Sequence, residues 1–541
     1  MNRRTFLATA AAGAVAGIDA APAVDEQSSA SPKNAPGLRP DRFELADTTV
    51  SDLQNRMKQG ALTAERAVEL YLARIEAIDR NGPSLRSVIE VNPDALRIAR
   101  ALDAERKNGS LRGPLHGIPV LVKDNIDTAD GMQTTAGSLA LVGPPARSDS
   151  WVAERLRAAG AVILGKTNLS EWANFRSTHA TSGWSGRGGQ TLNPYALDRN
   201  PCGSSSGSGV AVSANLCALG IGSETDGSVV CPSSMCGIVG IKPTVGLIGR
   251  SGIIPISHTQ DTAGPMARTV QDAAALLGVL TGIDRNDQAT QGSAGKFYSD
   301  YTQFLDVNGL KGVRLGVVRQ YFNIGPAVTA VMEECLDVMR RAGAIIIDPA
   351  DVPAFEKWRE SEMEVLLYEF KTGLNAYLAA RGTAVKSLED LVAFNKAHHA
   401  AEMPYFGQEL FEQAQQKGPL TDKAYTDALA NDVRLSRREG IDALLSKYKV
   451  DAAVAPTAGP AWTTDWISGD HADSGCASPP AVAGYPHVTV PAGFVFGLPV
   501  GISFFASAWT EPRLIKYAYA FEQARKARRI PSFSPTVNYY A

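Results

Sequence analysis

A polar, glycine-rich stretch covering residues 176–209 is the feature that most constrains how this chain of 541 residues can fold. Its composition predicts little regular structure, whereas the segments on both sides of it carry apolar runs. A loop this long inside a compact domain is usually functional. We therefore expect residues 176–209 to lie over a rigid scaffold and to contribute to a functional site.

That scaffold alternates helices with short apolar strands. Helices are predicted to begin after Thr63 as N-cap and to cover residues 93–108, 151–159 and 510–528. Apolar runs predict buried strands at residues 118–122, 161–165, 451–455, 487–493 and 500–505. This alternation predicts an α/β fold, with a mixed β-sheet core covered by helices on both sides.

Residues 354–448 differ from the rest of the chain, because they are more charged and have a helical pattern without strand runs. We interpret them as a helical insertion or cap on the core. The length alone would suggest three or four domains. However, the segments that carry chemistry are spread along the whole chain, so we expect a single domain over residues 43–541.

The N-terminus is expected to be a targeting signal rather than part of the fold. In residues 1–23, Arg3 and Arg4 precede an Ala/Gly-rich apolar run and small residues suited to signal peptidase. This pattern predicts a twin-arginine export signal, and with it a periplasmic or secreted bacterial protein. The run is too short to span a bilayer, so no stable membrane anchor is expected. A disordered terminus with a chance Arg pair is the alternative, and residues 24–42 are interpreted as a linker.

Charge and composition exclude several classes of function. The net charge is −3, so there is no general electrostatic case for binding nucleic acid or an anionic membrane. Six cysteines are too few for a disulfide scaffold, and neither C-x-x-C nor H-E-x-x-H occurs. We expect no metal and no organic cofactor, and a monomer.

Three residues stand out as carriers of chemistry. Lys123 ends the apolar run at 118–122, Ser204 lies within CGSSSGSG, and Ser228 lies within SETDGSVVCP. A serine hydroxyl is a weak nucleophile until a base takes its proton. A lysine can be that base if burial against apolar walls makes it neutral. A second serine can relay the proton, and the turn at residues 225–228 can direct its N–H groups at one oxygen.

These segments resemble the amidase signature family. The matching stretches are GPLHGIPVLVKD (113–124), the Gly/Ser loop (203–209), GSETDGSVVCP (222–232), DTAGPMAR (261–268), AVAGYP (481–486) and VPAG (490–493). The likeness covers about residues 43–541 and implies the amidase signature fold. It also implies a Ser–cis-Ser–Lys triad that cleaves a carboxamide through an acyl-enzyme, with Ser228 as nucleophile, Ser204 as relay and Lys123 as base. The implied oxyanion hole is made by the backbone N–H groups of Thr225, Asp226, Gly227 and Ser228.

Three departures from the family pattern bear on the substrate. The family usually has Gly where Asp226 stands and Arg where Val230 stands, and its loop more commonly reads GGSSGG where this chain has CGSSSG from Cys202. Together with NLSEWANFR (168–176) and GWSGRGG (183–189), these resemble the branch of bacterial peptide amidases, which remove the C-terminal amide from peptides and release ammonia. The resemblance thus implies a small-molecule or short peptide amide as substrate. We expect Asp226 to accept a hydrogen bond from the amide nitrogen or the backbone of that substrate.

Three alternatives stay open. The substrate could be an aryl, fatty or small aliphatic amide. The string GSSSG also fits G-x-S-x-G, which would make Ser205 the nucleophile of an α/β-hydrolase with His471 or His487 as base. The residues before it have loop rather than strand character, which disfavours that reading. Finally, some chains of the family hand ammonia to a partner subunit in tRNA-dependent amidation, a role that the predicted export signal disfavours.

Overall fold

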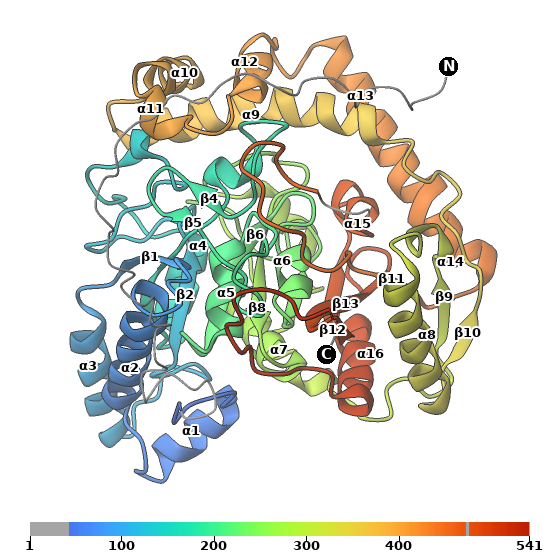
Figure 1. The fold of residues 1–541 in the computed structure, drawn as a ribbon, viewed down its shortest axis with the longest axis horizontal. Coiled ribbons are helices and arrows are strands. Elements are labelled where there is room, and N and C mark those ends of the chain that lie inside the picture. The colour runs from blue at the N-terminus through green and yellow to red at the C-terminus, as the bar shows by residue number, and fades with distance from the viewer. Residues whose placement is uncertain (1–42, 472–474, 540–541) are drawn as a thin grey trace, which may run out of the picture. The chain divides into compact units, whose positions relative to one another are not determined.

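One large mixed β-sheet lies at the centre of the computed structural model, which describes residues 43–471 and 475–539 (Figure 1). It has 11 strands. In their order across the sheet these are β1 (Val88–Val91), β3 (Val162–Thr167), β2 (Pro119–Lys123), β6 (Leu219–Glu224), β8 (Thr262–Ala267), β7 (Val239–Lys242), β12 (His487–Val495), β13 (Leu498–Phe505), β11 (Ala452–Pro456), β9 (Arg314–Val317) and β10 (Ile345–Ile347). A separate small sheet pairs β4 (Trp184–Ser185) with β5 (Gly189–Gln190), inside the long polar stretch.

The strand directions are mixed. β2 runs parallel to β3 and to β6, and β9 runs parallel to β10 and β11. The other neighbouring pairs of the large sheet are antiparallel. Each of the five strands that the sequence predicts forms within a few residues of its expected position. The predicted α/β class with a mixed sheet is therefore confirmed.

Helices pack against this sheet along its length. The helices around the sheet are α1 (Val50–Lys58), α2 (Ala64–Arg74), α3 (Ala95–Lys107), α4 (Trp151–Ala158), α5 (Ser206–Ser213), α6 (Val230–Met235), α7 (Val270–Leu280), α8 (Pro326–Arg341), α15 (Ser478–Val482) and α16 (Glu511–Arg525). The Thr63 hydroxyl accepts a hydrogen bond from the backbone of Arg66 and so caps α2 as expected. α5 and α7 both contact β6 and β8, and α6 contacts β7, β12 and β13.

The charged segment after β10 contains a run of helices. These are α9 (Arg359–Arg381), α10 (Leu388–Ala397), α11 (His399–Glu402), α12 (Glu409–Gln415), α13 (Lys423–Val433) and α14 (Asp442–Tyr448). α9 is the long helix at the top of Figure 1, and α10, α12 and α13 pack against it. An apolar cluster that includes Phe370 of α9 and Phe411 of α12 also contains Trp172 and Phe175. Packing thus joins these helices to the start of the long polar stretch.

The pairing of β2 with β6 decides where the candidate residues lie. Every residue of β2 is buried, as its sequence PVLVK requires of a strand inside a sheet. Val122 lies opposite Ile221 in the parallel register, so both strands end at the same edge of the sheet. Lys123 is therefore placed beside the segment that runs from Ser223 into the turn before Ser228.

Residues Arg39–Ala541 form one compact unit. Within the described ranges, no helix combines the length and the apolar character that crossing a bilayer requires. The predicted export signal at residues 1–23 and the predicted linker at 24–42 lie outside the described residues.

Candidate active site

Lys123 is fully buried at the end of β2, and its amine faces hydroxyl groups. Its Nζ atom lies 2.7 Å from Oγ of Ser204 and 3.0 Å from Oγ of Ser223. Burial lowers the pKa of Lys123 from its ordinary value to about 7, and the negative charges of Asp261 and Glu224 oppose this shift only in part. A substantial fraction of this side chain is consequently an uncharged amine near neutral pH.

Two further residues hold the lysine in place, and the sequence analysis did not find them. The carbonyl oxygen of Ser223 accepts a hydrogen bond from Nζ of Lys123 at 3.1 Å. The amide of Asn125 donates to Oγ of Ser223 at 2.9 Å. Ser223 lies inside the stretch 222–232 that carries the family resemblance, and Asn125 directly follows the stretch 113–124. Only the three-dimensional contacts show that Ser223 bonds to the amine and that Asn125 holds Ser223.

Ser204 lies in the Gly/Ser loop that leads into α5. The Gly203–Ser204 peptide bond is cis. The backbone of this loop passes so close to its neighbours that a Cβ on Gly203 would come within 2.2 Å of Oγ of Ser170. The loop is tied to the next segment by the backbone N–H of Ser205, which donates to the carbonyl of Ser228 at 3.1 Å. The structure thus brings Lys123, Ser204 and the Ser228 segment together.

Ser228 ends a tight turn after β6, and a buried carboxylate fixes the backbone that follows the turn. Oε2 of Glu224 accepts hydrogen bonds from the backbone N–H groups of Val229 at 2.7 Å and Val230 at 3.0 Å. Gly227 has φ +80°, in the left-handed region that glycine adopts without strain. The backbone N–H groups of Asp226, Gly227 and Ser228 donate to no acceptor among the described residues. They are therefore available to a ligand oxygen.

Thr225, at the start of the turn, is fixed from the other side. Its hydroxyl donates to Oδ1 of Asp261 at 2.6 Å, and its carbonyl accepts a hydrogen bond from the side chain of Gln260 at 3.3 Å. Oδ2 of Asp261 in turn accepts from the backbone N–H groups of Ile256 and Ser257. This network makes the turn a preorganised element rather than a mobile loop.

Asp226, within the turn, is partly exposed. Loss of hydration raises the pKa of Asp226 above its usual value, and a hydrogen bond from Ser478 offsets only part of this shift. Glu362 of α9 lies against it, and burial next to a second carboxyl group raises the pKa of Glu362 well above its usual range. The pair therefore keeps a proton to higher pH than free carboxyl groups would.

The residues of the α/β-hydrolase alternative lie elsewhere. The hydroxyl of Ser205 donates to the carbonyl of Ser223 at 3.1 Å and is buried. His471 pairs with Asp465, and His487 bonds to Ser503. Among the residues that the structure describes, neither histidine is hydrogen-bonded to Ser205.

A cavity of about 190 Å³ opens next to the residues that hold Lys123. Asn125, Ser223 and Thr225 contribute to its lining, and isoleucines at 253, 254 and 256 give it an apolar wall. Among the described residues, no group of three or more His, Cys, Asp or Glu side chains is arranged to hold a metal ion.

Comparison with known proteins places this geometry in a family. The amidase family model matches residues 66–515. A protein of Arabidopsis thaliana named as an amidase is 44% identical over 502 residues, covering 91% of this chain and 92% of the relative. An amidase-named protein of the fungus Arthroderma benhamiae is 40% identical over 501 residues, covering 88% and 81%. The native peptide amidase of Stenotrophomonas maltophilia is 52% identical, with TM-score 0.87, covering 91% of this chain and 99% of that one.

These comparisons overturn the predicted localisation. The expectation of an exported, periplasmic or secreted bacterial protein is wrong, because three curated relatives at 39–44% identity are plant and fungal amidases whose names do not refer to export. The physical basis of that expectation is a pair of arginines, Arg3 and Arg4, before a short run of small residues. Such a pattern consists of common residue types and is weak evidence for the compartment in which a protein is found.

The likeness spans nearly the whole described chain, at identities far above the level at which only the fold is shared. The chain belongs to the amidase signature family and is an amidase-type hydrolase.

Proposed function

We propose that this amidase hydrolyses carboxamides to a carboxylic acid and ammonia, with C-terminal peptide amides as its main substrates. The observation that carries the chemistry is the contact of 2.7 Å between Nζ of the buried Lys123 and Oγ of Ser204. The substrate class is supported by the likeness to the peptide amidase of Stenotrophomonas maltophilia.

The proposed acylation starts with neutral Lys123. Its amine takes the proton of the Ser204 hydroxyl, while Ser204 takes the proton of Ser228. Oγ of Ser228 then attacks the carboxamide carbon, and the resulting oxyanion accepts hydrogen bonds from backbone N–H groups of residues 225–228. The relayed proton passes to the amide nitrogen, the C–N bond breaks, and ammonia leaves an acyl-enzyme on Ser228.

Deacylation uses the same groups in a second round. A water molecule gives a proton to the Ser204–Lys123 relay and attacks the acyl carbon. The ester bond to Ser228 breaks, the proton returns to Oγ of Ser228, and the carboxylic acid is released. Every proton that the lysine accepts is returned within one turnover, so the cycle consumes only amide and water.

The test is a screen for ammonia release by the isolated chain on peptide amides, free amino-acid amides and anilides. We expect the highest kcat/KM on peptide amides, without any partner subunit. Ser228→Ala and Lys123→Ala should be nearly inactive, and a serine-directed fluorophosphonate should label Ser228 alone. Preference for aryl, fatty or small aliphatic amides would overturn the substrate class, and full activity of Ser228→Ala would overturn the mechanism.

A further inference from the structure

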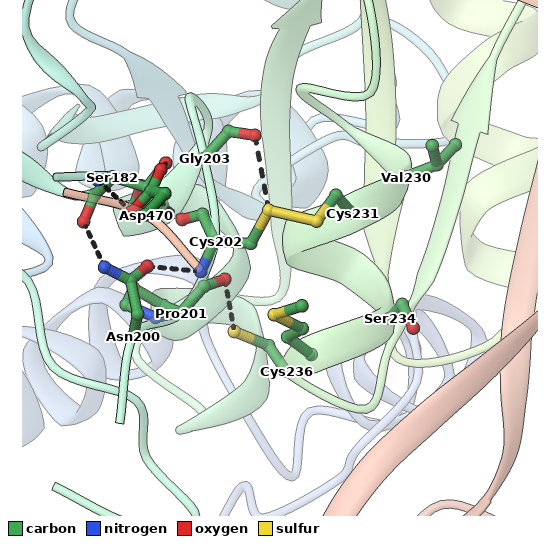
Figure 2. The surroundings of a disulfide bond; sticks show 12 residues. Ser182, Asn200, Pro201, Cys202, Gly203, Val230, Cys231, Ser234, Cys236 and Asp470 are labelled. Atoms are coloured by element: carbon green, nitrogen blue, oxygen red, sulfur yellow. Dashed lines mark hydrogen bonds between the residues drawn. A yellow bond between two sulfur atoms is a disulfide. The ribbon is translucent and has the colours of Figure 1, made fainter. Parts of the chain in front are cut away.

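A disulfide bond joins the two segments that carry the candidate serines (Figure 2). It links Cys202, two residues before Ser204, to Cys231, three residues after Ser228. The other four cysteines are buried free thiols. The one cross-link of this chain that the structure describes therefore lies between the relay loop and the nucleophile turn.

Both ends of the cross-link are anchored in the site. The backbone N–H of Cys202 donates to Oδ1 of Asn200 at 2.8 Å, and its carbonyl accepts from Oγ of Ser206 at 2.6 Å (Figure 2 shows the first of these). The backbone N–H of Cys231 donates to the carbonyl of Gly227 at 2.8 Å. One sulfur is thus attached to the loop of Ser204, and the other to the turn that presents Ser228.

The backbone conformation at Cys202 is unfavourable for a residue with a side chain. Its φ is +61°, in the left-handed region where glycine is the usual residue. Gly203 beside it has no room for a side chain, because Ser170 packs against it. The loop is therefore held in a strained position. Besides the cross-link, hydrogen bonds of Ser205 tie it to the nucleophile segment, from its backbone N–H to the carbonyl of Ser228 and between its hydroxyl and the backbone of Ser223.

We propose that the Cys202–Cys231 disulfide is a positioning element for the reaction, so that turnover depends on its oxidised state. In this proposal it keeps the loop of the relay serine beside the turn of the nucleophile, an arrangement that proton transfer between their hydroxyls requires. This inference rests on the proposed Ser228–Ser204–Lys123 mechanism, because only that mechanism needs the two serines to act together. Displacements of about 1 Å in such an arrangement cost on the order of 100-fold in rate.

The bond is open to chemical change. Cys231 is partly exposed, and Cys202 is 6% exposed. A dithiol can break the S–S bond by exchange: two cysteine thiols form, and the dithiol closes to its own cyclic disulfide. Two electrons and two protons pass from the dithiol to the protein, and an oxidant reverses the step.

The experiment compares the wild-type chain with the double variant C202A/C231A, and with C236A as matched control. Cys236 lies in the same region, with its sulfur 4.0 Å from the carbonyl of Pro201, but it is not cross-linked. Four quantities are measured: kcat and KM for ammonia release, the rate at which a fluorophosphonate labels Ser228, and the melting temperature. A thiol titration of the unfolded, unreduced wild-type chain should find four of its six cysteines free.

We expect kcat and the labelling rate of C202A/C231A to fall by about 10- to 100-fold, with KM within about twofold of wild type. C236A should keep wild-type rates. Dithiothreitol should lower the wild-type rates to those of the double variant, and reoxidation should restore them. If the double variant does not fold, the dithiothreitol arm decides, with circular dichroism used to show that the reduced chain stays folded.

A double variant with wild-type kcat and labelling but a lower melting temperature would overturn the proposal, because the bond would then only stabilise the fold. Six free thiols in the unreduced chain would overturn it too. A failure of the proposed mechanism looks different: the fluorophosphonate would then react as well with Ser228→Ala as with wild type, whatever the state of the cysteines.

Discussion

The charge of Lys123 decides whether the site can accept a proton. In the described part of the chain, its amine bonds to hydroxyl and carbonyl groups and has no carboxylate within hydrogen-bond distance. Burial therefore dominates, and the ammonium form is disfavoured. The same amine paired with an aspartate would stay charged and could not act as a base.

The first prediction is a pH profile with a defined sign. The pKa of Lys123 lies at about 7, and only the neutral amine accepts a proton. kcat/KM should therefore be constant above this pH and fall about tenfold for each unit below it. Lys123→Ala should lose about 100-fold or more in kcat. Steady-state rates from pH 5 to 9 measure both effects.

Lys166 offers a matched control for the lysine prediction. It is also fully buried, and burial lowers its pKa to about 8, but its amine donates to the carbonyl of Ile126 and the hydroxyl of Thr134. Lys166→Met should shift the melting temperature and leave the midpoint of the pH profile in place. If Lys166→Met moves the midpoint of the pH profile, the titrating amine is that of Lys166, and the prediction for Lys123 is wrong.

Asp226 carries the second prediction, which concerns substrate choice. Asp226 is a partly exposed residue of the turn whose N–H groups face no acceptor among the described residues, and we expect its carboxyl group to accept a hydrogen bond from the substrate. Losing a hydrogen bond to a charged group costs about 1.5–3 kcal/mol, or roughly 10- to 100-fold in kcat/KM. Asp226→Gly should therefore lower kcat/KM for peptide amides more than for acetamide-like amides.

Asp226→Asn is the comparison that separates shape from charge. It keeps a side-chain acceptor of the same size and should lose less than the glycine variant. An unchanged ranking of substrates in Asp226→Gly would show that this carboxyl group does not contact the substrate.

At the scale of the elements, the Gly/Ser loop has no room for a larger residue at Gly203. A methyl group on Gly203 would meet Oγ of Ser170 at 2.2 Å and Oγ of Ser206 at 3.0 Å. Because these neighbours are themselves buried, the loop must move rather than the neighbours. Any such movement shifts Ser204 away from Lys123.

The third prediction follows from this packing. Gly203→Ala should lower kcat by about 100-fold and reduce the free energy of unfolding by about 1–3 kcal/mol. Gly143→Ala is the control, because Gly143 is exposed and has no atom within 4 Å of an added Cβ. Activity in Gly203→Ala equal to that of Gly143→Ala would mean that the loop can shift without moving its serine.

The sequence predicts those parts of the site whose contacting residues are close together along the chain, and not those whose residues are far apart. The apolar run before Lys123 correctly predicts a buried strand, because one short segment contains all the information needed. The partners of the lysine are different: Ser204 and Ser223 lie 81 and 100 residues away. Here the residue types suggest the chemistry, but the contacts come from the parallel pairing of β2 with β6.

The disulfide could not be predicted for the same reason. Cys202 and Cys231 are 29 residues apart, and six cysteines of ordinary spacing specify no pairing. The pairing follows from the return of the chain through β6, which brings the nucleophile turn back to the Gly/Ser loop. A pattern of residue types does not contain that return path.

At the scale of the whole molecule, the helices after β10 are joined to the core by buried carboxylates. Glu369 of α9 accepts hydrogen bonds from the hydroxyl of Ser257 and the backbone N–H of Thr259. Glu402, at the end of α11, accepts from the backbone N–H of Leu139. We propose that residues 354–448 are an insertion within one amidase domain at 43–541, and not a separately folding domain, because such bonds satisfy both partners only in the joined structure.

The last prediction tests the boundary of that domain. Every residue placed in the candidate site lies between Lys123 and Ser478, inside the compact unit Arg39–Ala541. A chain that begins at residue 43 should therefore fold and keep kcat within about twofold of the full chain, since the preorganised groups are all retained. Its melting temperature should lie within a few degrees of the full-length value, about the size of a change near 1 kcal/mol. A truncated chain that folds but loses turnover would place part of the site before residue 43, and one that fails to fold would move the boundary of the domain towards the N-terminus.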